Sequence, residues 1–416
     1  MIPIDTDVLV LGGGTAGIAA ARAAARADEA VTLVEAGRVG GPRTLLAWRV
    51  LERTVDRHLA RGPAARDAVW DEARAELTRL AALREERLGL RLADAGVDVV
   101  NGRGRFTSAH ELEVEGGPTI RFDRAVLAVG ATSHGLAGDR PDGRRLVTPD
   151  RLFEVERLPA DVLVIGGGAA GAELVDALSR LKDVEVTWVM DEVGILPRFE
   201  RELAEALGDV LLGRGVKLVH GKRVEAVTVE PHRAIARLEG GHGYEAPLVV
   251  ACAGRRGVPP GLGLEALGLS SLEVDERVQT PVEHVWAAGE SAGHCPSAAH
   301  AEAMGRLAGR AAAGEEIRPW DPSQIPLVVR SHPQLAQVGQ TPEVLVGQPV
   351  VLHTARSEEA LAGLLAGIGE SADQKGFVRL ACDSTTGRVL GLSAAGPSAA
   401  NMASAAAIAL RLGATD

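Results

Sequence analysis

The chain has 416 residues, of which 46% are hydrophobic and only 3% aromatic, and 50 are glycines. This length exceeds one ordinary domain and allows two or three units, each with its own core. The formal net charge of −11 provides no basic field for phosphate backbones, which argues against nucleic acid or an anionic membrane as a partner and favours a small-molecule substrate.

The N-terminal residues run directly into an apolar strand. The opening MIPIDTDVLVLGGG has no basic segment of the kind that precedes a signal sequence, and no apolar run in the chain is long enough to span a bilayer. We therefore expect a cytoplasmic protein without a membrane span.

The first predicted unit reads as strand, glycine turn, helix and second strand in DVLVLGGGTAGIAAARAAARADEAVTLVEAG. Gly12, Gly14 and Gly17 have the spacing in which the first glycine permits a tight turn, the second admits a pyrophosphate and the third lets helix pack on strand. Glu35 ends the second strand, where a carboxylate binds a ribose hydroxyl. The pattern predicts a dinucleotide site, with a plain strand-to-helix turn as the alternative.

Residues 44–96 form a long stretch in which apolar residues recur at helical spacing between charged ones. We expect two amphipathic helices, broken at Gly62-Pro63, whose charge runs face solvent.

The dinucleotide pattern recurs in ADVLVIGGGAAGAELVDALSRLKDVEVTWVMDE. Gly166, Gly168 and Gly171 repeat the spacing of the first unit, and a second strand again follows the helix. Because each helix would offer amide groups to a pyrophosphate, two such units predict two bound dinucleotides.

The three cysteines, Cys252, Cys295 and Cys382, are odd in number, far apart, and not arranged as C-x-x-C. This spacing indicates neither a disulfide framework nor a zinc site, and we predict no metal site. We expect Cys252 and Cys382 to lie in the core and Cys295 to be a small buried residue.

Several further segments resemble the flavin-dependent pyridine nucleotide-disulfide oxidoreductases, the family of glutathione reductase and lipoamide dehydrogenase. DRAVLAVGATS is similar to a family strand ending in Ala-Thr-Gly, with Val129 in the threonine position. LVVACAGRRG is similar to its Gly-Arg segment, and VWAAGESAG to its flavin-contacting Gly-Asp segment, with Glu290 where aspartate is usual. IPLVVRSHPQLAQVGQTPE and the residues from 376 onward are similar to its interface domain.

The resemblance implies an α/β fold with two Rossmann-like dinucleotide-binding domains and an α+β C-terminal interface domain. It implies FAD on the first unit, a nicotinamide nucleotide on the second, and a homodimer formed through the last third. The expected segments are 1–154 and 273–321 for the FAD domain, 155–272 for the NAD(P) domain and 322–416 for the interface domain. The residues expected to bind the cofactors are Gly12, Gly14, Gly17, Glu35, Gly40, Gly41, Gly130, Gly166, Gly168, Gly171, Asp191, Gly254, Arg255, Gly289 and Glu290.

The segment EAGRVGGPRTLLAWRV lacks the sulfur that the family keeps there. The family pattern is Gly-Gly-Thr-Cys-x-x-x-x-Cys-x-Pro, whereas here Gly40-Gly41 is followed directly by Pro42. The family also ends in a His-x-x-x-x-Glu segment that acts on the leaving thiolate, and this sequence stops before it, at LRLGATD. Both differences remove thiol chemistry, so we expect a changed reaction.

Glu173 matches the carboxylate of the family's Lys-Glu pair beside the flavin, with Arg43 or Thr44 in the lysine position. We predict Glu173 and Arg43 as the catalytic residues. The alternative for Glu173 is a helix-face carboxylate stabilised by the helix dipole.

The residues after the second unit's last strand, Met190, Asp191 and Glu192, offer no cation for a 2′-phosphate, so NADH is favoured over NADPH. Arg198, a few residues later, is a cation that weakens this preference.

Three functions stay open. The first is reduction of a quinone or another small acceptor, as in family members without the dithiol, which include soluble transhydrogenases. The second is oxidation of a specialised metabolite, and the third is a non-catalytic flavoprotein scaffold. The intact glycines of the second unit favour the first.

Overall fold

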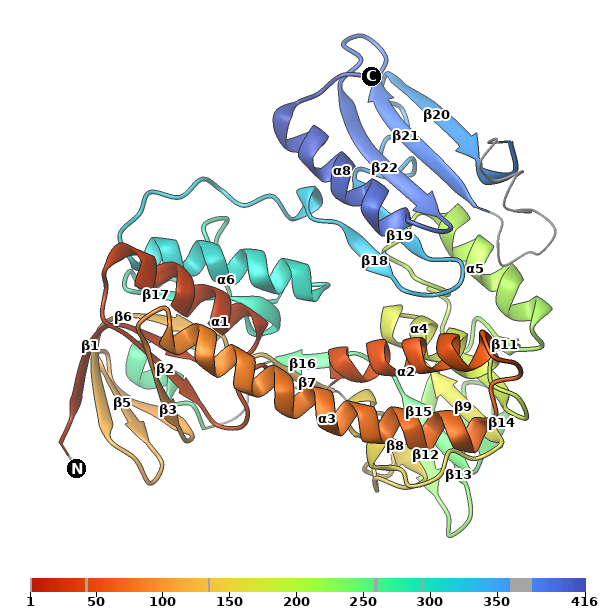
Figure 1. Cartoon of the computed structure of the whole chain (residues 1–416), viewed down its shortest axis with the longest axis horizontal. Coiled ribbons are helices and arrows are strands. Elements are labelled where there is room, and N and C mark those ends of the chain that lie inside the picture. Colours follow the sequence, from red (N-terminus) through yellow and green to blue (C-terminus); the bar gives the residue numbers. More distant parts are fainter. Residues whose placement is uncertain (1, 42–43, 134, 258–260, 294, 360–375) are drawn as a thin grey trace. The chain divides into compact units, whose positions relative to one another are not determined.

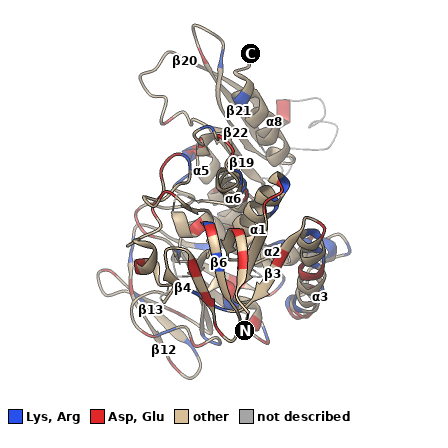
Figure 2. Cartoon of the chain, turned by 90° about the vertical axis from the view of Figure 1, so that its left-hand side faces the viewer, with Lys and Arg blue, Asp and Glu red and all other residues tan. Residues whose placement is uncertain are grey.

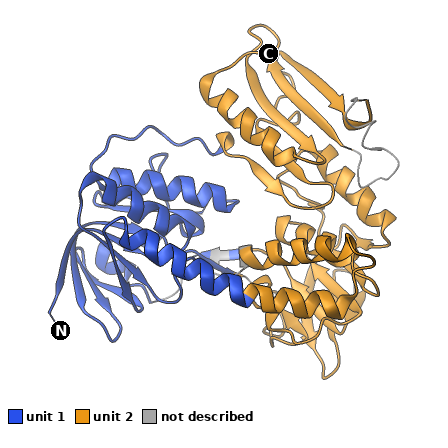
Figure 3. Ribbon diagram, viewed as in Figure 1, with its two compact units in different colours: residues 1–43, 78–132, 255–322 blue, residues 44–77, 133–254, 323–416 orange. Residues whose placement is uncertain are grey.

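The structure is a computed structural model that describes residues 2–41, 44–133, 135–257, 261–293, 295–359 and 376–416. It divides into two compact units, each made from separate stretches of chain (Figure 3). Unit 1 contains residues 1–43, 78–132 and 255–322, and unit 2 contains residues 44–77, 133–254 and 323–416. The expected four-segment division is finer than this, and its boundaries remain a prediction.

Unit 1 is built on a seven-stranded sheet (Figure 1). Its strands are β1 (Ile4–Leu11), β2 (Val31–Glu35), β3 (Val97–Asn101), β4 (Gly104–Ser108), β5 (Glu111–Val114), β6 (Thr119–Leu127) and β17 (Val285–Ala287). The order is β3-β2-β1-β6-β5-β4, with β17 also paired to β6. Strands β1, β2, β3, β6 and β17 are parallel, whereas β4 and β5 form an antiparallel extension. The continuous apolar run that ends β1 is buried, as is typical of a parallel strand covered on both faces.

Helices α1 (Thr15–Ala24) and α6 (Ala298–Ala312) pack closely within unit 1. A Cβ added at Gly305 would lie 2.0 Å from the Ala16 carbonyl oxygen, and one at Gly309 would lie 2.2 Å from the Ala20 oxygen. Two backbones approach this closely only where a side chain is absent. The high alanine and glycine content is thus used in part to bring these helices together.

Unit 2 contains a second, parallel sheet and an antiparallel three-stranded sheet. The parallel sheet has the order β11-β10-β9-β15-β8, made of β8 (Leu146–Val147), β9 (Asp161–Ile165), β10 (Glu185–Val189), β11 (Lys217–Val219) and β15 (Leu248–Ala251). The antiparallel sheet consists of β12 (Val224–Val229), β13 (Ala234–Leu238) and β14 (Gly243–Ala246). The helices of this part are α2 (Thr44–Leu59), α4 (Ala169–Ser179) and α5 (Arg201–Gly213).

The last part of unit 2 is an antiparallel five-stranded sheet with helix α8 (Ala399–Leu412) against it (Figure 1). Its strands are β18 (Leu327–Val329), β19 (Leu335–Gly339), β20 (Val350–Arg356), β21 (Phe377–Asp383) and β22 (Val389–Ala395), in the order β18-β19-β22-β21-β20. The buried alanines of α8 pack on β19 and β22.

Helices α2 and α3 (Arg66–Ala93) flank Gly62-Pro63, so the predicted break is confirmed. Figure 2 shows acidic and basic residues along α3. The remaining elements are β7 (Ala131–Ser133), β16 (Arg255–Gly257), and the 3-10 turns η1 (Ala25–Ala27), η2 (Pro149–Glu154), η3 (Leu264–Leu267), η4 (Gly289–Ala292), η5 (Pro322–Gln324) and η6 (Ser357–Glu359). None of the helices in the described part of the chain combines the length and apolar composition that a membrane crossing requires.

Candidate dinucleotide-binding sites

The first glycine turn joins β1 to α1 in unit 1. Gly12 has a φ of +105°, and a Cβ there would lie 2.3 Å from the Ala128 carbonyl oxygen. A Cβ at Gly17 would lie 1.7 Å from the Gly12 oxygen, whereas one at Gly14 would meet nothing within 4 Å. The first and third glycines are therefore required by packing, and the second leaves open space where a pyrophosphate can approach the backbone.

The second glycine turn joins β9 to α4 in unit 2 and repeats this geometry. Gly166 has a φ of +111°, and a Cβ there would lie 2.3 Å from the Cys252 oxygen. A Cβ at Gly171 would lie 2.2 Å from the Gly166 oxygen, and one at Gly168 would meet nothing within 4 Å. Both turns thus leave room at the same position of the motif.

The two helices that follow these turns begin without a side-chain cap. The N-cap residues are Gly14 for α1 and Gly168 for α4, and neither helix start has a side-chain capping hydrogen bond. Amide groups of a first helical turn have no partner within the helix and suit a phosphate. Open glycine and uncapped helix together fit a dinucleotide pyrophosphate in each unit.

The predicted ribose ligand of the first unit, Glu35, is fixed by the backbone around it. Its Oε2 accepts a hydrogen bond from the Gly13 amide at 2.5 Å, and its Oε1 accepts one from the Gly37 amide at 2.6 Å. The carboxylate is thereby held at the glycine turn, at the end of β2.

The Gly40–Gly41 loop folds back on the same turn. The Gly40 amide donates to the Gly13 oxygen at 2.7 Å, and a Cβ at Gly41 would lie 3.2 Å from the Gly14 Cα. The Arg84 guanidinium donates to the Gly40 oxygen at 2.6 Å, and burial lowers its pKa. Sequence reasoning missed Arg84, because a half-buried arginine in a charge-rich helix has the same local pattern as its solvated neighbours.

Three other residues predicted to bind the cofactors, Arg255, Gly289 and Glu290, gather in unit 1. The Arg255 Nε lies 2.7 Å from the Glu290 carboxylate, and the guanidinium also donates to the Ala131 oxygen. Gly289, with a φ of +76°, lies against α1, since a Cβ there would be 3.0 Å from the Ala16 Cβ.

Two predicted glycines, Gly130 and Gly254, have positive φ values of +68° and +103° and face open space, with nothing within 4 Å of an added Cβ. Their backbone conformations favour glycine whatever binds nearby. Their predicted contacts with the cofactors remain a prediction.

Asp191, the predicted ribose ligand of the second unit, is exposed. Its Oδ1 accepts the Val193 amide at 3.2 Å, and the loop that follows it closes on the glycine turn, with the Leu196 amide donating to the Gly167 oxygen at 2.8 Å. The Lys222 amide donates to the Met190 oxygen at 3.4 Å, so the loop after β11 also borders this position. Sequence reasoning missed that neighbour, because it lies in a loop that follows a different strand of the sheet.

Two protein-family models match this chain, one over the dinucleotide-binding part and one over the C-terminal part. The model of the pyridine nucleotide-disulphide oxidoreductase family matches residues 6–305, and the model of its dimerisation domain matches residues 325–416. The chain belongs to this family.

Individual members of the family extend over nearly the whole chain. The chain is 29% identical to the NAD(P)H dehydrogenase (quinone) of Mycobacterium tuberculosis, over 98% of this chain and 88% of that protein. It is 29% identical to the soluble pyridine nucleotide transhydrogenase of Mycobacterium bovis, over 96% of this chain and 89% of that protein. The crystal structure of LpdA from Mycobacterium tuberculosis has 26% identity and a TM-score of 0.89, and the match covers 99% of this chain and 94% of that one.

These findings confirm the predicted fold class and the cofactors FAD and NAD(P)H. The chain is an FAD-dependent NAD(P)H oxidoreductase. The roles predicted for individual site residues stay predictions.

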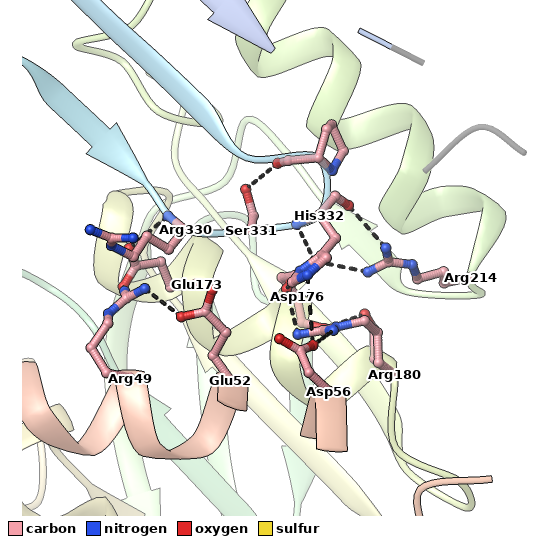
Figure 4. Close-up of polar contacts among 12 residues, drawn as sticks. Arg49, Glu52, Asp56, Glu173, Asp176, Arg180, Arg214, Arg330, Ser331 and His332 are labelled. Atoms are coloured by element: carbon pink, nitrogen blue, oxygen red, sulfur yellow. Dashed lines mark hydrogen bonds and ion pairs between the residues drawn. The ribbon is translucent and has the colours of Figure 1, made fainter. Parts of the chain in front are cut away.

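The predicted catalytic residue Glu173, on α4, lies in a half-buried ionic cluster (Figure 4). Its carboxylate pairs with Arg49 of α2 and accepts the Arg330 amide at 2.9 Å, while Arg49 also binds Glu52 at 2.6 Å. Burial raises the pKa of Glu173 and of Glu52, although Arg49 opposes the rise in both. The other predicted catalytic residue, Arg43, lies outside the described residues.

A second ionic cluster surrounds Asp176, one helical turn further along α4 (Figure 4). The Asp176 carboxylate lies 2.9 Å from Arg214 and 3.2 Å from Arg180. It also accepts the His332 amide at 2.9 Å and lies 3.3 Å from the His332 Nδ1. Burial acts to raise the pKa of Asp176, but these partners together hold it below its usual value. His332 is therefore held against Asp176 by both its backbone amide and its ring.

The three cysteines are free thiols in the structure. Cys382 is buried, as predicted, while Cys252 and Cys295 are half-buried. Burial raises the pKa of the Cys252 thiol to about 12, with Asp150 adding to the rise, and does the same for Cys295, to about 12, with Glu290 adding.

Proposed function

We propose that this oxidoreductase reduces a small diffusible acceptor, such as a quinone, with electrons from NADH and without a thiol relay. The observation that supports this proposal most directly is the position of the cysteines in the sequence. No cysteine precedes Cys252, and Gly40-Gly41, after which the family pattern continues to its first thiol, is followed here directly by Pro42.

The thiols that the chain does have are poorly suited to a relay. A thiol is nucleophilic as its thiolate, and burial raises the pKa of the Cys252 and Cys295 thiols to about 12, which favours the protonated, unreactive form at neutral pH. Cys252 and Cys295 are also free and unpaired with each other. These properties support direct transfer to an acceptor rather than reduction of a disulfide.

When bound, FAD supplies an acceptor for the hydride of the nicotinamide and a donor for the final substrate. The residues proposed here hold and orient it. The open backbone at Gly14 and the amides of α1 receive its pyrophosphate, Glu35 receives its ribose, and Glu290 with Arg255 lines the return segment. In the second unit, the open backbone at Gly168 is proposed to receive the pyrophosphate of the nicotinamide nucleotide, and Asp191 its ribose.

The preference for NADH is part of the proposal. Asp191 and Glu192 are exposed and negatively charged, so both repel the 2′-phosphate that distinguishes NADPH.

The likeness to the NAD(P)H dehydrogenase (quinone) of Mycobacterium tuberculosis supports a quinone as acceptor, and the match to the dimerisation domain supports a homodimer. Glu173, neutralised by Arg49, keeps its proposed catalytic role, with Arg43 as its second proposed partner.

The test is anaerobic stopped-flow absorbance of the flavin-loaded protein mixed with NADH or NADPH. We expect rapid bleaching of the oxidised flavin band, faster with NADH, and reoxidation on addition of menadione but not of lipoamide or glutathione disulfide. The variant Cys295→Ser is the matched control and should reoxidise at the wild-type rate. Reoxidation by a disulfide that is lost in Cys295→Ser would overturn the proposal.

Transfer between two nicotinamide nucleotides is the second candidate, supported by the likeness to the Mycobacterium bovis transhydrogenase. The same reduced protein, mixed with thio-NAD⁺, separates the two. Reoxidation by thio-NAD⁺ faster than by any quinone would favour the transhydrogenase.

A further inference from the structure

Three side chains with metal-binding atoms converge in the C-terminal part of unit 2. They are His353 on β20, Cys382 on β21 and Asp416, which follows α8. One ligand atom from each lies within 4.8 Å of the other two. The residues are far apart in sequence, which is why the cysteine spacing gave no sign of them.

The strand register places the imidazole and the thiol on one face of the sheet. Val351 is paired with Cys382, and His353 lies two residues beyond Val351 on the same strand. Because side chains alternate along a strand, His353 and Cys382 point to the same side as diagonal neighbours. Cys382 is only 1% exposed, whereas the His353 side chain is 53% exposed.

The backbone around Asp416 brings its carboxylate to this place. The Val389 amide donates to the Ala414 oxygen at 2.9 Å, and the Asp416 amide donates to the Gly387 oxygen at 3.1 Å. These bonds tie the segment after α8 to the turn between β21 and β22. The Asp416 Oδ2 then lies 3.3 Å from the His353 Nε2.

We propose that His353, Cys382 and Asp416 form a binding site for a thiophilic divalent cation of the Zn²⁺ class. Imidazole nitrogen, thiolate sulfur and carboxylate oxygen are the ligands that Zn²⁺ takes, whereas Mg²⁺ and Ca²⁺ require oxygen. Three protein ligands leave the fourth tetrahedral position for water.

The separations are close to those of a formed site. Metal–ligand bonds of about 2.0–2.3 Å place tetrahedral ligands roughly 3.3–3.8 Å apart. The widest separation here, within 4.8 Å, therefore closes by about 1 Å. The two exposed side chains, His353 and Asp416, can rotate by this amount while the buried sulfur stays in place.

Binding at this site releases a proton, because the thiol must ionise. The affinity for the metal should therefore increase with pH.

The test uses Co²⁺, whose tetrahedral thiolate complexes absorb at wavelengths longer than the bands of oxidised flavin. The full, flavin-loaded chain is stripped with a chelator and titrated with Co²⁺ and then with Zn²⁺. We expect d–d absorption that saturates at equimolar Co²⁺, is stronger at pH 8 than at pH 6, and disappears when Zn²⁺ displaces Co²⁺.

Single substitutions test which side chains bind the metal. Cys382→Ser should abolish the thiolate-dependent absorption, while His353→Gln and Asp416→Asn should each weaken binding by more than about tenfold. The latter two side chains are partly exposed, so these variants should fold even if Cys382→Ser does not. Cys252→Ser and Cys295→Ser are the matched thiol controls and should bind Co²⁺ like the wild type. Absence of the d–d bands, or bands unchanged in His353→Gln and Asp416→Asn, would overturn the site.

Discussion

The two dinucleotide units begin alike and differ in how their first helix is covered. Helix α1 follows an open glycine and packs on α6 through backbone contacts at Gly305 and Gly309. Helix α4 also follows an open glycine, but it carries Asp176 in a buried cluster of charges. One turn geometry is therefore compatible with a close-packed apolar neighbour and with an ionic one.

The acids that end the second strands differ as well. Glu35 has both carboxylate oxygens bound to amides and a loop folded beside it, whereas Asp191 is exposed and accepts a single amide among the bonds described. The first arrangement suits a cofactor that stays bound through many turnovers. The second suits a nucleotide that must enter and leave in each cycle.

The largest effect should come from removing the buried carboxylate of α4. Asp176→Ala removes the buried carboxylate that both Arg180 and Arg214 contact, and Arg180 keeps only its more exposed pair with Asp56 among the ion pairs described. Breaking a buried ion pair costs about 3–5 kcal/mol. Urea denaturation should show this loss. Asp209→Ala, an exposed acid on α5, is the control and should change the free energy of unfolding by less than about 0.5 kcal/mol. If the two variants lost equal amounts of unfolding free energy, the ionic cluster around Asp176 would not contribute specially to the stability of this unit.

The pH dependence of stability should separate the two helices further. The pKa of Asp176 is held below its usual value, so its contribution is fully present above the unfolded-state pKa of about 3.9 and is lost as the pH falls through the lower folded-state value. The stability difference between wild type and Asp176→Asn should therefore be constant from pH 7 to about 4 and shrink below that. Urea denaturation at a series of pH values measures it. A difference that grows on acidification would contradict the assigned direction of the pKa.

Overpacking the α1–α6 contact should have the next largest effect. A Cβ at Gly309 would lie 2.2 Å from the Ala20 oxygen, so Gly309→Ala must force the helices apart, at a cost of about 1–3 kcal/mol. Gly213→Ala, on α5, is the matched control, because a Cβ there meets nothing within 4 Å. It should be neutral or stabilising, since alanine is the better helix former. Thermal denaturation checks both, and similar melting temperatures would show that the close contact is not needed.

The two open glycines should affect binding more than folding. Gly14→Ala should lower flavin retention, and Gly168→Ala should raise the KM for NADH, each by about tenfold, because the added methyl group occupies the space left for a pyrophosphate. Flavin absorbance per chain and steady-state kinetics measure the two effects. Each variant serves as the control of the other: loss of flavin in Gly168→Ala, with NADH binding intact, would reverse the assignment of the two units.

The sequence predicted what is local and missed what is assembled from distant residues. Each glycine turn and its terminal acid fall within one strand-helix-strand unit, so their spacing alone located them. The partner of Glu173 could not be found in this way, because Arg49 is 124 residues away and lies on a helix whose charges look solvated. The same holds for Arg84, which binds the Gly40 oxygen from 44 residues away. A sequence pattern detects residues that are close along the chain, whereas these charged side chains contact residues that only the folded structure brings near.

The smallest expected effect tests the exposed acid of the second unit. Asp191→Ala removes one of two negative charges next to the proposed 2′-phosphate position, and because the site is exposed the repulsion amounts to about 1 kcal/mol, or roughly fivefold. The ratio of kcat/KM for NADPH to that for NADH should rise by this factor, and the rise should diminish at high salt. Glu239→Ala, an exposed acid elsewhere in the unit, should leave the ratio unchanged. An unchanged ratio in Asp191→Ala would mean that nucleotide choice lies with other groups, and the neighbouring loop that carries Lys222 would become the next position to vary.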